Sequence, residues 1–280
     1  MLDQREICRE IIAELEAGTL VLPTLPAVAL RVNDAASDPD VSLADLADVL
    51  GTDVALAAQL VRVANSPIYR GRYPVDNIQV AVSRLGLKVT KNLVSSLIME
   101  QMFRAPSPAL EARLEALWQH SVEVAAISRV LASKHPGISP EEAMLAGLTH
   151  GIGMLPILVK ADAEPERFSD EAVLRDVIRK LNAPIGVAIL QGWGFPAGLV
   201  EVVAEHENYQ RQSLGAPDLV DIVQVATLQS HYSDHEFSDA ELADIPSFAK
   251  LGVQAELQVV ELEENSEEYA EALALFRRSA

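Results

Sequence analysis

Cysteine and basic charge are both scarce in this sequence. Cys8 is the only cysteine among the 280 residues, which excludes an internal disulfide and any cysteine-rich metal site. A lone thiol is typical of a reducing compartment, so we expect a cytoplasmic protein. The charged N-terminus, MLDQREICRE, also lacks the apolar stretch of a signal peptide. Because 49% of the chain is hydrophobic, it can bury a large core.

The charge balance argues against polyanionic partners. Lys and Arg number 22 against 41 Asp and Glu, which gives a net charge of -19 that repels phosphate backbones and anionic membrane surfaces. The basic residues are scattered, so we expect no nucleic-acid partner. The longest apolar run, Ala143–Val159, contains His150 and Pro156 and is shorter than the roughly 20 residues that span a bilayer. We interpret it as buried core and expect no membrane insertion.

No stretch has an alternating pattern long enough to predict a β-strand, whereas helical periodicity is present throughout. Apolar residues recur at spacings of three and four behind Ser, Thr and Asp residues, which predicts an all-α fold class. Ser42 and Asp45 have the capping-box spacing, and Thr52 is the predicted cap of the following helix. The segment Ser139–Glu142 combines an N-cap with a proline at the first helical position.

A break in composition at Ala105-Pro106-Ser107-Pro108 divides the chain. We expect an N-terminal helical subdomain at residues 1–104, a second helical subdomain at residues 105–235 and an acidic helical extension at residues 236–280. Charge runs of this kind are usually solvated helix faces. The acidic run of the extension comprises Glu261, Glu263, Glu264, Glu267 and Glu268.

Four of the helices predicted in the second subdomain lie between Leu110 and Trp193. A long helix starts near Leu110, passes through His120 and continues toward Leu131. The helix that starts at Pro140 ends at His150. Leu174–Leu181 and Gly186–Trp193 are predicted to be separate helices.

Several motifs resemble the signature of the HDOD domain family, whose members are helical relatives of the HD and HD-GYP phosphohydrolases. They are the connector LPTLPAVALRV, the stretch TDVALAAQLVRVANSPIYRGRYPVDNIQVAVSRLG and the segment KVTKNLV, within a similarity that spans about Leu22 to Tyr232. Val54 departs from the family, which often has proline there. The residues that carry the signature are Leu25, Pro26, Asp53, Asn65, Ser66, Leu85 and Gly86.

The resemblance implies two tightly joined helical subdomains, of which the second is an HD-like bundle. Members of the family commonly serve as output or scaffold units in bacterial signal transduction. In HD phosphohydrolases, histidines and two aspartates hold divalent metal, and the carboxylates offset its charge. The resemblance places these positions at His120, His150-Gly151, His206 and Thr227. Both aspartates are therefore missing, which predicts a non-catalytic domain with no metal and no cofactor.

The leading hypothesis is thus a cytoplasmic regulatory or scaffold module that binds other signalling proteins. Because three imidazoles can bind zinc with an open fourth position, a second hypothesis is a phosphohydrolase with an altered metal set centred on His120, His150 and His206. Glu205 and Glu207 flank His206 and are expected to point to different faces of a helix. A third hypothesis is a sensor of a nucleotide second messenger.

One cluster combines basic and aromatic residues. Tyr69, Arg70, Arg72 and Tyr73 follow the Asn65-Ser66 break in a predicted loop. We interpret them as a packed family loop, and the alternative is a surface that recognises an anionic ligand such as a cyclic dinucleotide.

Overall fold

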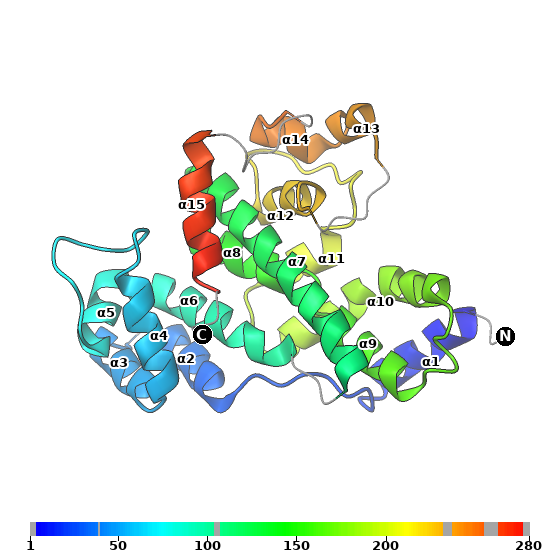
Figure 1. Cartoon of the computed structure of the whole chain (residues 1–280), viewed down its shortest axis with the longest axis horizontal. Helices are drawn as coiled ribbons and strands as arrows, with labels where there is room; N and C mark the ends of the chain where they lie inside the picture. The colour runs from blue at the N-terminus through cyan, green and yellow to red at the C-terminus, as the bar shows by residue number, and fades with distance from the viewer. Residues whose placement is uncertain (1–3, 39, 104–106, 232–236, 255–262, 277–280) are drawn as a thin grey trace.

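The computed structural model describes residues 4–38, 40–103, 107–231, 237–254 and 263–276, and every regular element within these ranges is a helix (Figure 1). The predicted all-α fold class is therefore confirmed. The helices are α1 (Gln4–Glu16), α2 (Ala27–Ser37), α3 (Leu43–Gly51), α4 (Val54–Ala64), α5 (Ile78–Leu85), α6 (Leu87–Met99), the 3-10 helix η1 (Glu100–Phe103), α7 (Pro108–Ser133), α8 (Pro140–Thr149), α9 (Met154–Ala163), α10 (Glu171–Gly192), α11 (Ala197–Glu205), α12 (Leu219–Leu228), α13 (Asp239–Ala243), α14 (Pro246–Leu251) and α15 (Glu263–Ala274).

Side-chain caps set where several helices begin. Ser42 and Asp45 form the predicted capping box at the start of α3. The cap of α4 differs from the prediction, because Asp53 and not Thr52 accepts the hydrogen bond from the backbone N–H of Leu56, at 3.0 Å. The Thr52 hydroxyl instead donates to the carbonyl of Val49 at 2.7 Å and so belongs to the end of α3.

Helix α10 is continuous, so the prediction of two separate helices in this region was wrong. Pro184 lies inside the helix, where proline removes one backbone hydrogen bond. Tertiary packing offsets that loss, because Asn182 and Gly186 press against the turn at Gly153. A Cβ atom added at Gly153 would stand 2.0 Å from the carbonyl oxygen of Asn182 and 2.7 Å from the nitrogen of Gly186. The backbones of the turn and of α10 therefore touch directly.

Helix α7 is the longest helix of the described chain and supports α8, α9, α12 and α15. Helix α6 packs on both α2 and α8 and thereby joins α2–α5 to the rest (Figure 1). Helix α1 packs against α10, at the end of the molecule away from α3–α5. An ion pair of 2.8 Å between Glu14 and Lys160 fixes α1, and Trp193 Nε1 donates to the carbonyl of Pro23 in the connector at 3.1 Å.

The sequence predicts three parts along the chain. Both boundaries, 104/105 and 235/236, lie outside the described residues, as do Tyr232 and Glu261. One hydrophobic cluster runs through the helices on both sides of the first boundary, from Ile7 in α1 to Phe276. The helical parts are therefore joined by a shared core, as the resemblance implies.

The apolar run that was interpreted as core is indeed buried. Pro140–Ala163 is long and apolar enough to cross a membrane by length and composition, but 83% of its apolar window is buried inside the molecule. The segment consists of α8 and α9 with a turn at residues 150–153 between them. It forms the centre of the bundle against α7.

The close contact at Gly153 yields a stability prediction. We expect Gly153→Ala to lower the free energy of unfolding by ~3 kcal/mol or more, because backbone atoms of α10 would have to move. The control is Gly192→Ala, at the last residue of α10. Nothing lies within 4 Å of its added Cβ atom, so stability should stay equal or rise by about 0.5–1 kcal/mol. Urea titrations measure both, and equal effects would contradict the prediction.

Candidate functional site

Three histidines from separate helices meet in the bundle. His120 lies within α7, whereas His150 and His206 are the residues that directly follow α8 and α11. The ring centroids are 5.0 Å apart for His120 and His150 and 5.2 Å apart for His150 and His206. The structure thus brings together the three histidines that the sequence analysis selected, and we call them the histidine stack.

Backbone carbonyls fix which nitrogen carries the proton in His150 and His206. His150 Nδ1 lies 2.6 Å from the carbonyl oxygen of Gly147, so this nitrogen carries the proton and Nε2 holds a lone pair. His120 Nε2 lies 3.2 Å from His150 Nε2, and the tautomer of His120 decides whether it donates to that lone pair. His206 Nδ1 faces the carbonyls of Val202 and Val203 at 3.1 and 3.2 Å.

The two deepest histidines are neutral at pH 7. His150 and His206 are each 1% exposed. Burial lowers the pKa of His150 to about 3 and that of His206 to about 4, because a charged imidazole would lose its hydration. Proximity to His206 lowers the pKa of His150 further. The stack is therefore uncharged at its centre.

The resemblance assigns the two missing carboxylates to Gly151 and Thr227. Gly151 lies in the turn after α8, and Thr227 lies on α12. A Cβ atom added at Gly151 would lie 3.3 Å from Cδ1 of Leu117, and no backbone atom is among its nearest neighbours. The hydroxyl of Thr227 is buried and has no hydrogen-bond partner within the described residues. These two positions carry no group that could balance the charge of a metal.

Glu207 lies differently from the expectation. It follows the end of α11, so helical geometry does not direct it to another face, and its Oε1 lies 3.6 Å from His206 Nε2. Burial raises the pKa of Glu207. The argument from opposite helix faces does not apply to Glu207, because α11 ends at Glu205.

The donor set does not fit the divalent metal of an HD phosphohydrolase. In the part of the chain that is described, no group of three or more His, Cys, Asp or Glu side chains could hold a metal ion. The positions that the resemblance assigns to the two metal-binding aspartates hold Gly151 and Thr227 here, so neither position supplies a carboxylate.

A buried carboxylate that the sequence analysis missed extends the site. Ser230 Oγ lies 3.3 Å from His120 Nδ1, and the hydroxyl donates to the buried side chain of Glu123. His231 Nδ1 and the hydroxyl of Tyr269 contact the other oxygen of Glu123 at 2.5 and 3.2 Å. Burial alone would raise the pKa of Glu123, but these hydrogen bonds lower it. The available signal was a glutamate one turn after His120 in an apolar stretch.

The signature residues of the first subdomain have local structural roles. Asn65 exchanges two hydrogen bonds with the backbone of Val75, at 2.7 and 2.8 Å, and so closes the loop between α4 and α5. Asp53 caps α4, and Gly86 ends α5 with a φ of 78° that favours glycine. Leu85 is the last residue of α5. Leu25 is buried, Pro26 precedes α2, and the Ser66 hydroxyl is enclosed.

The basic and aromatic cluster divides into two parts. The Tyr69 hydroxyl donates to Glu141 Oε1 at 2.9 Å, and the Arg129 guanidinium lies 5.6 Å from the Tyr69 ring centroid. Burial raises the pKa of Tyr69 well above its ordinary value. Arg70, Arg72 and Tyr73 are exposed. Tyr69 therefore ties the loop to α7 and α8, while the other three face solvent.

Together, the bundle and the histidine stack define a helical domain of the HD type whose metal-binding carboxylates are absent. The model of the HDOD domain matches residues 22–209, two thirds of the chain, and the chain therefore belongs to the HDOD domain family.

Three relatives illustrate the similarity. A proposed metal-dependent phosphohydrolase of Shewanella amazonensis SB2B is 30% identical, with a TM-score of 0.85, and 99% of this chain covers 100% of it. A proposed signal transduction protein of Marinobacter aquaeolei VT8 is 22% identical, with a TM-score of 0.63. The match covers 98% of this chain and 66% of that protein. An uncharacterised protein of Treponema pallidum (strain Nichols) is 24% identical over 229 residues, 77% of this chain. The match spans 43% of that curated relative.

The buried neutral histidines predict a loss of stability in mild acid. Both pKa values are lower in the folded chain than the ordinary value of about 6.5, so protons bind the unfolded chain first. Stability is complete above pH ~6.5 and is lost as the pH falls toward 4. We expect the free energy of unfolding to drop by roughly 2–4 kcal/mol between pH 7 and pH 5. Urea titrations across this range measure the drop.

Two variants test whether the buried histidines cause the loss of stability between pH 7 and pH 5. His206→Gln should reduce the drop by about half, because one of two buried histidines is removed. His135→Gln, at a partly exposed histidine outside the stack, should leave it unchanged. A free energy of unfolding that does not change between pH 7 and pH 5 in the unmodified chain would contradict the prediction.

The two tyrosines of the loop yield a matched pair of variants. Tyr69→Phe should lower the free energy of unfolding by about 1–2 kcal/mol, because the buried Glu141 loses a hydrogen-bond donor. Tyr73→Phe should have no measurable effect, since Tyr73 is 70% exposed. Chemical denaturation at pH 7 compares them, and equal stabilities would show that the loop is not anchored through Tyr69.

Proposed function

We propose that this chain is a non-catalytic regulatory module of bacterial signal transduction that acts by binding other proteins. One observation carries the proposal. The bundle keeps the three histidines of an HD site but turns them toward each other, with His120 Nε2 3.2 Å from His150 Nε2 and no carboxylate at Gly151 or Thr227. A site of this kind lacks the two aspartates whose charge offsets that of the metal in HD phosphohydrolases.

Family membership and the composition support the proposal. The chain belongs to the HDOD family, and a relative from Marinobacter is named as a proposed signal transduction protein. A net charge of -19 and a single buried cysteine are compatible with a cytoplasmic protein that meets other proteins.

Phosphohydrolysis with an altered ligand set is the second candidate, and two observations favour it. Three imidazoles lie together, and Glu207 Oε1 lies 3.6 Å from His206 Nε2. A relative from Shewanella is also named as a proposed metal-dependent phosphohydrolase. This candidate requires stoichiometric metal and turnover of a phosphoester, and both can be measured.

A nucleotide second messenger is the remaining candidate ligand. Arg70 and Arg72 are exposed on the loop after α4 and could contact a phosphate, whereas Tyr69 is engaged by Glu141. Equilibrium dialysis against a panel of nucleotides tests this candidate, and absence of binding removes it.

Restoration of the carboxylates tests the main proposal. We expect the purified chain to hold less than about 0.1 equivalent of divalent metal by mass spectrometry and to leave bis(p-nitrophenyl) phosphate uncleaved. The double variant Gly151→Asp/Thr227→Asp should gain metal affinity, since it places two carboxylates at the positions of the missing aspartates. Side chains rather than backbone surround the Gly151 position, so the turn can adapt.

The controls separate the outcomes. A stoichiometric metal in the unmodified chain that is lost in both His120→Ala and His150→Ala, together with phosphodiesterase turnover, would overturn the proposal in favour of the hydrolase. Asp substitution at exposed Gly51 and Ser83, away from the histidine stack, matches the added charge of the double variant and should bind no metal.

A further inference from the structure

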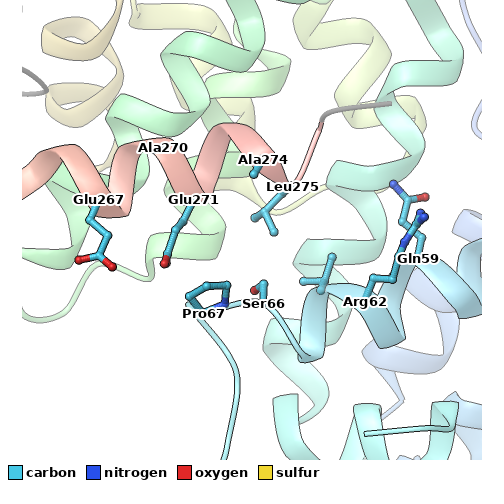
Figure 2. Close-up of a pocket in the computed structure, with 10 residues that line it drawn as sticks. Gln59, Arg62, Ser66, Pro67, Glu267, Ala270, Glu271, Ala274 and Leu275 are labelled. Carbon is cyan, nitrogen blue, oxygen red and sulfur yellow. The ribbon is translucent and has the colours of Figure 1, made fainter. Parts of the chain in front are cut away.

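A cavity lies between the first subdomain and the last described helix, apart from the histidine stack. Its volume is about 440 Å³, within the range of roughly 300–1,000 Å³ that is usual for ligand pockets. Figure 2 shows α15 on one side and α4 with the turn after it on the other. The lining residues are Gln59, Arg62, Val63, Ser66, Pro67, Glu267, Ala270, Glu271, Ala274 and Leu275.

Helix α15 is held in place by its opposite face. The Tyr269 hydroxyl donates to buried Glu123 at 3.2 Å, and Ser133 Oγ donates to Glu268 Oε2 at 3.0 Å, both on the side of α7. Phe276 packs edge-on against Trp118 with ring centroids 5.9 Å apart. Glu268 is therefore not part of a solvated acidic face, contrary to the expectation for the extension. The wall of the cavity is a fixed surface.

The lining combines an apolar wall with charge at one end. Val63, Pro67 and Leu275 supply apolar surface, together with two alanines of α15. Glu267 and Glu271 point from one side of α15 toward the gap (Figure 2). They are four residues apart, a spacing at which like charges repel on a helix. Across the described chain neither carboxylate has a cationic or hydrogen-bonding partner.

The other end of the cavity has polar side chains, of which the Gln59 amide supplies N–H donors. Gln59 and Arg62 lie on α4, beyond Ser66 from the carboxylates in Figure 2. An occupant that satisfies both ends needs an apolar stem, a cation at Glu267 and Glu271, and oxygen acceptors at the α4 end. A lysine or arginine within a peptide has all three, since its own backbone carbonyls are the acceptors.

We propose that this cavity binds a basic side chain, arginine or lysine, presented by a partner protein. The inference rests on the proposed function and names the chemistry of the partner. The net charge of -19 attracts basic segments over a distance, and the cavity then selects the side chain by its carboxylates. Because the occupant touches both α4 and α15, it bridges the first subdomain and the C-terminal helix.

Capped tripeptides are the probes for the test. We would titrate Ala-Arg-Ala, Ala-Lys-Ala, Ala-Ala-Ala and Ala-Glu-Ala into the isotope-labelled full chain and follow alanine methyl resonances by NMR. The basic peptides should shift Ala270 and Ala274 saturably, and the other two should not. Glu267→Gln/Glu271→Gln should weaken the arginine peptide by about tenfold, or about 1.4 kcal/mol.

A control matches that change of charge. Glu6→Gln/Glu16→Gln also removes two exposed carboxylates, but on α1 at the far end of the molecule (Figure 1), and should bind like the unmodified chain. Equal weakening in both double variants would overturn the inference by showing nonspecific attraction. The same holds if the arginine peptide binds no better than the alanine peptide, or if the free polyamine spermidine binds more tightly than either basic peptide.

The proposed function and this inference can fail separately. A metal-loaded, hydrolytically active chain overturns the first, whatever the peptides do. A metal-free chain in which Glu267→Gln/Glu271→Gln leaves the affinity for the arginine peptide unchanged overturns only the second.

Discussion

Two buried imidazoles, those of His150 and His206, impose the condition that the rest of the bundle has to meet. Both rings must remain neutral and each of their N–H groups must find an acceptor, because water is excluded from them. Helix ends satisfy this condition, because the last carbonyls of a helix have no partner within it. The carbonyl of Gly147 accepts from His150, and that of Val202 accepts from His206. The arrangement also requires α8 to approach α7 closely, and an added Cβ atom at Gly147 would lie 2.6 Å from Cα of Ala125.

Helix α7 also carries buried charged residues that connect it to other helices. Glu123 and Arg129 are buried charged residues on this helix, and each joins α7 to α15 through Tyr269 or Glu268. Arg129 also contacts Glu141 of α8, which accepts from Tyr69 of the first subdomain. The helices are thus joined by hydrogen-bonded polar groups as well as by apolar packing. Such contacts specify one arrangement, because an unpaired buried charge would be costly.

Local sequence signals predicted what depends on local chemistry. The all-α class, the capping box at Ser42 and the long α7 helix follow from periodicity and caps. The gathering of the three histidines followed from the resemblance and not from spacing. The continuity of α10 through Pro184, the position of Glu207 and the contacts of Glu123 depend on segments far apart in the chain. The local signal at Glu123, a glutamate within an apolar stretch, does not identify the partners of its carboxylate, which come from other segments.

The position of α1 changes how the first subdomain should be described. Helix α1 contributes Ile7 and Ile11 to the shared core and packs on α10, whereas α3–α5 lie at the other end of the molecule and α6 joins them to the bundle through α8. In topological terms the first subdomain is an insertion into the bundle, which begins with α1 and resumes at α7. Motion of α2–α6 is therefore tethered at both of its ends, and a cut near residue 104 would leave α1 on the wrong fragment, with the apolar surface of Ile7 and Ile11 uncovered.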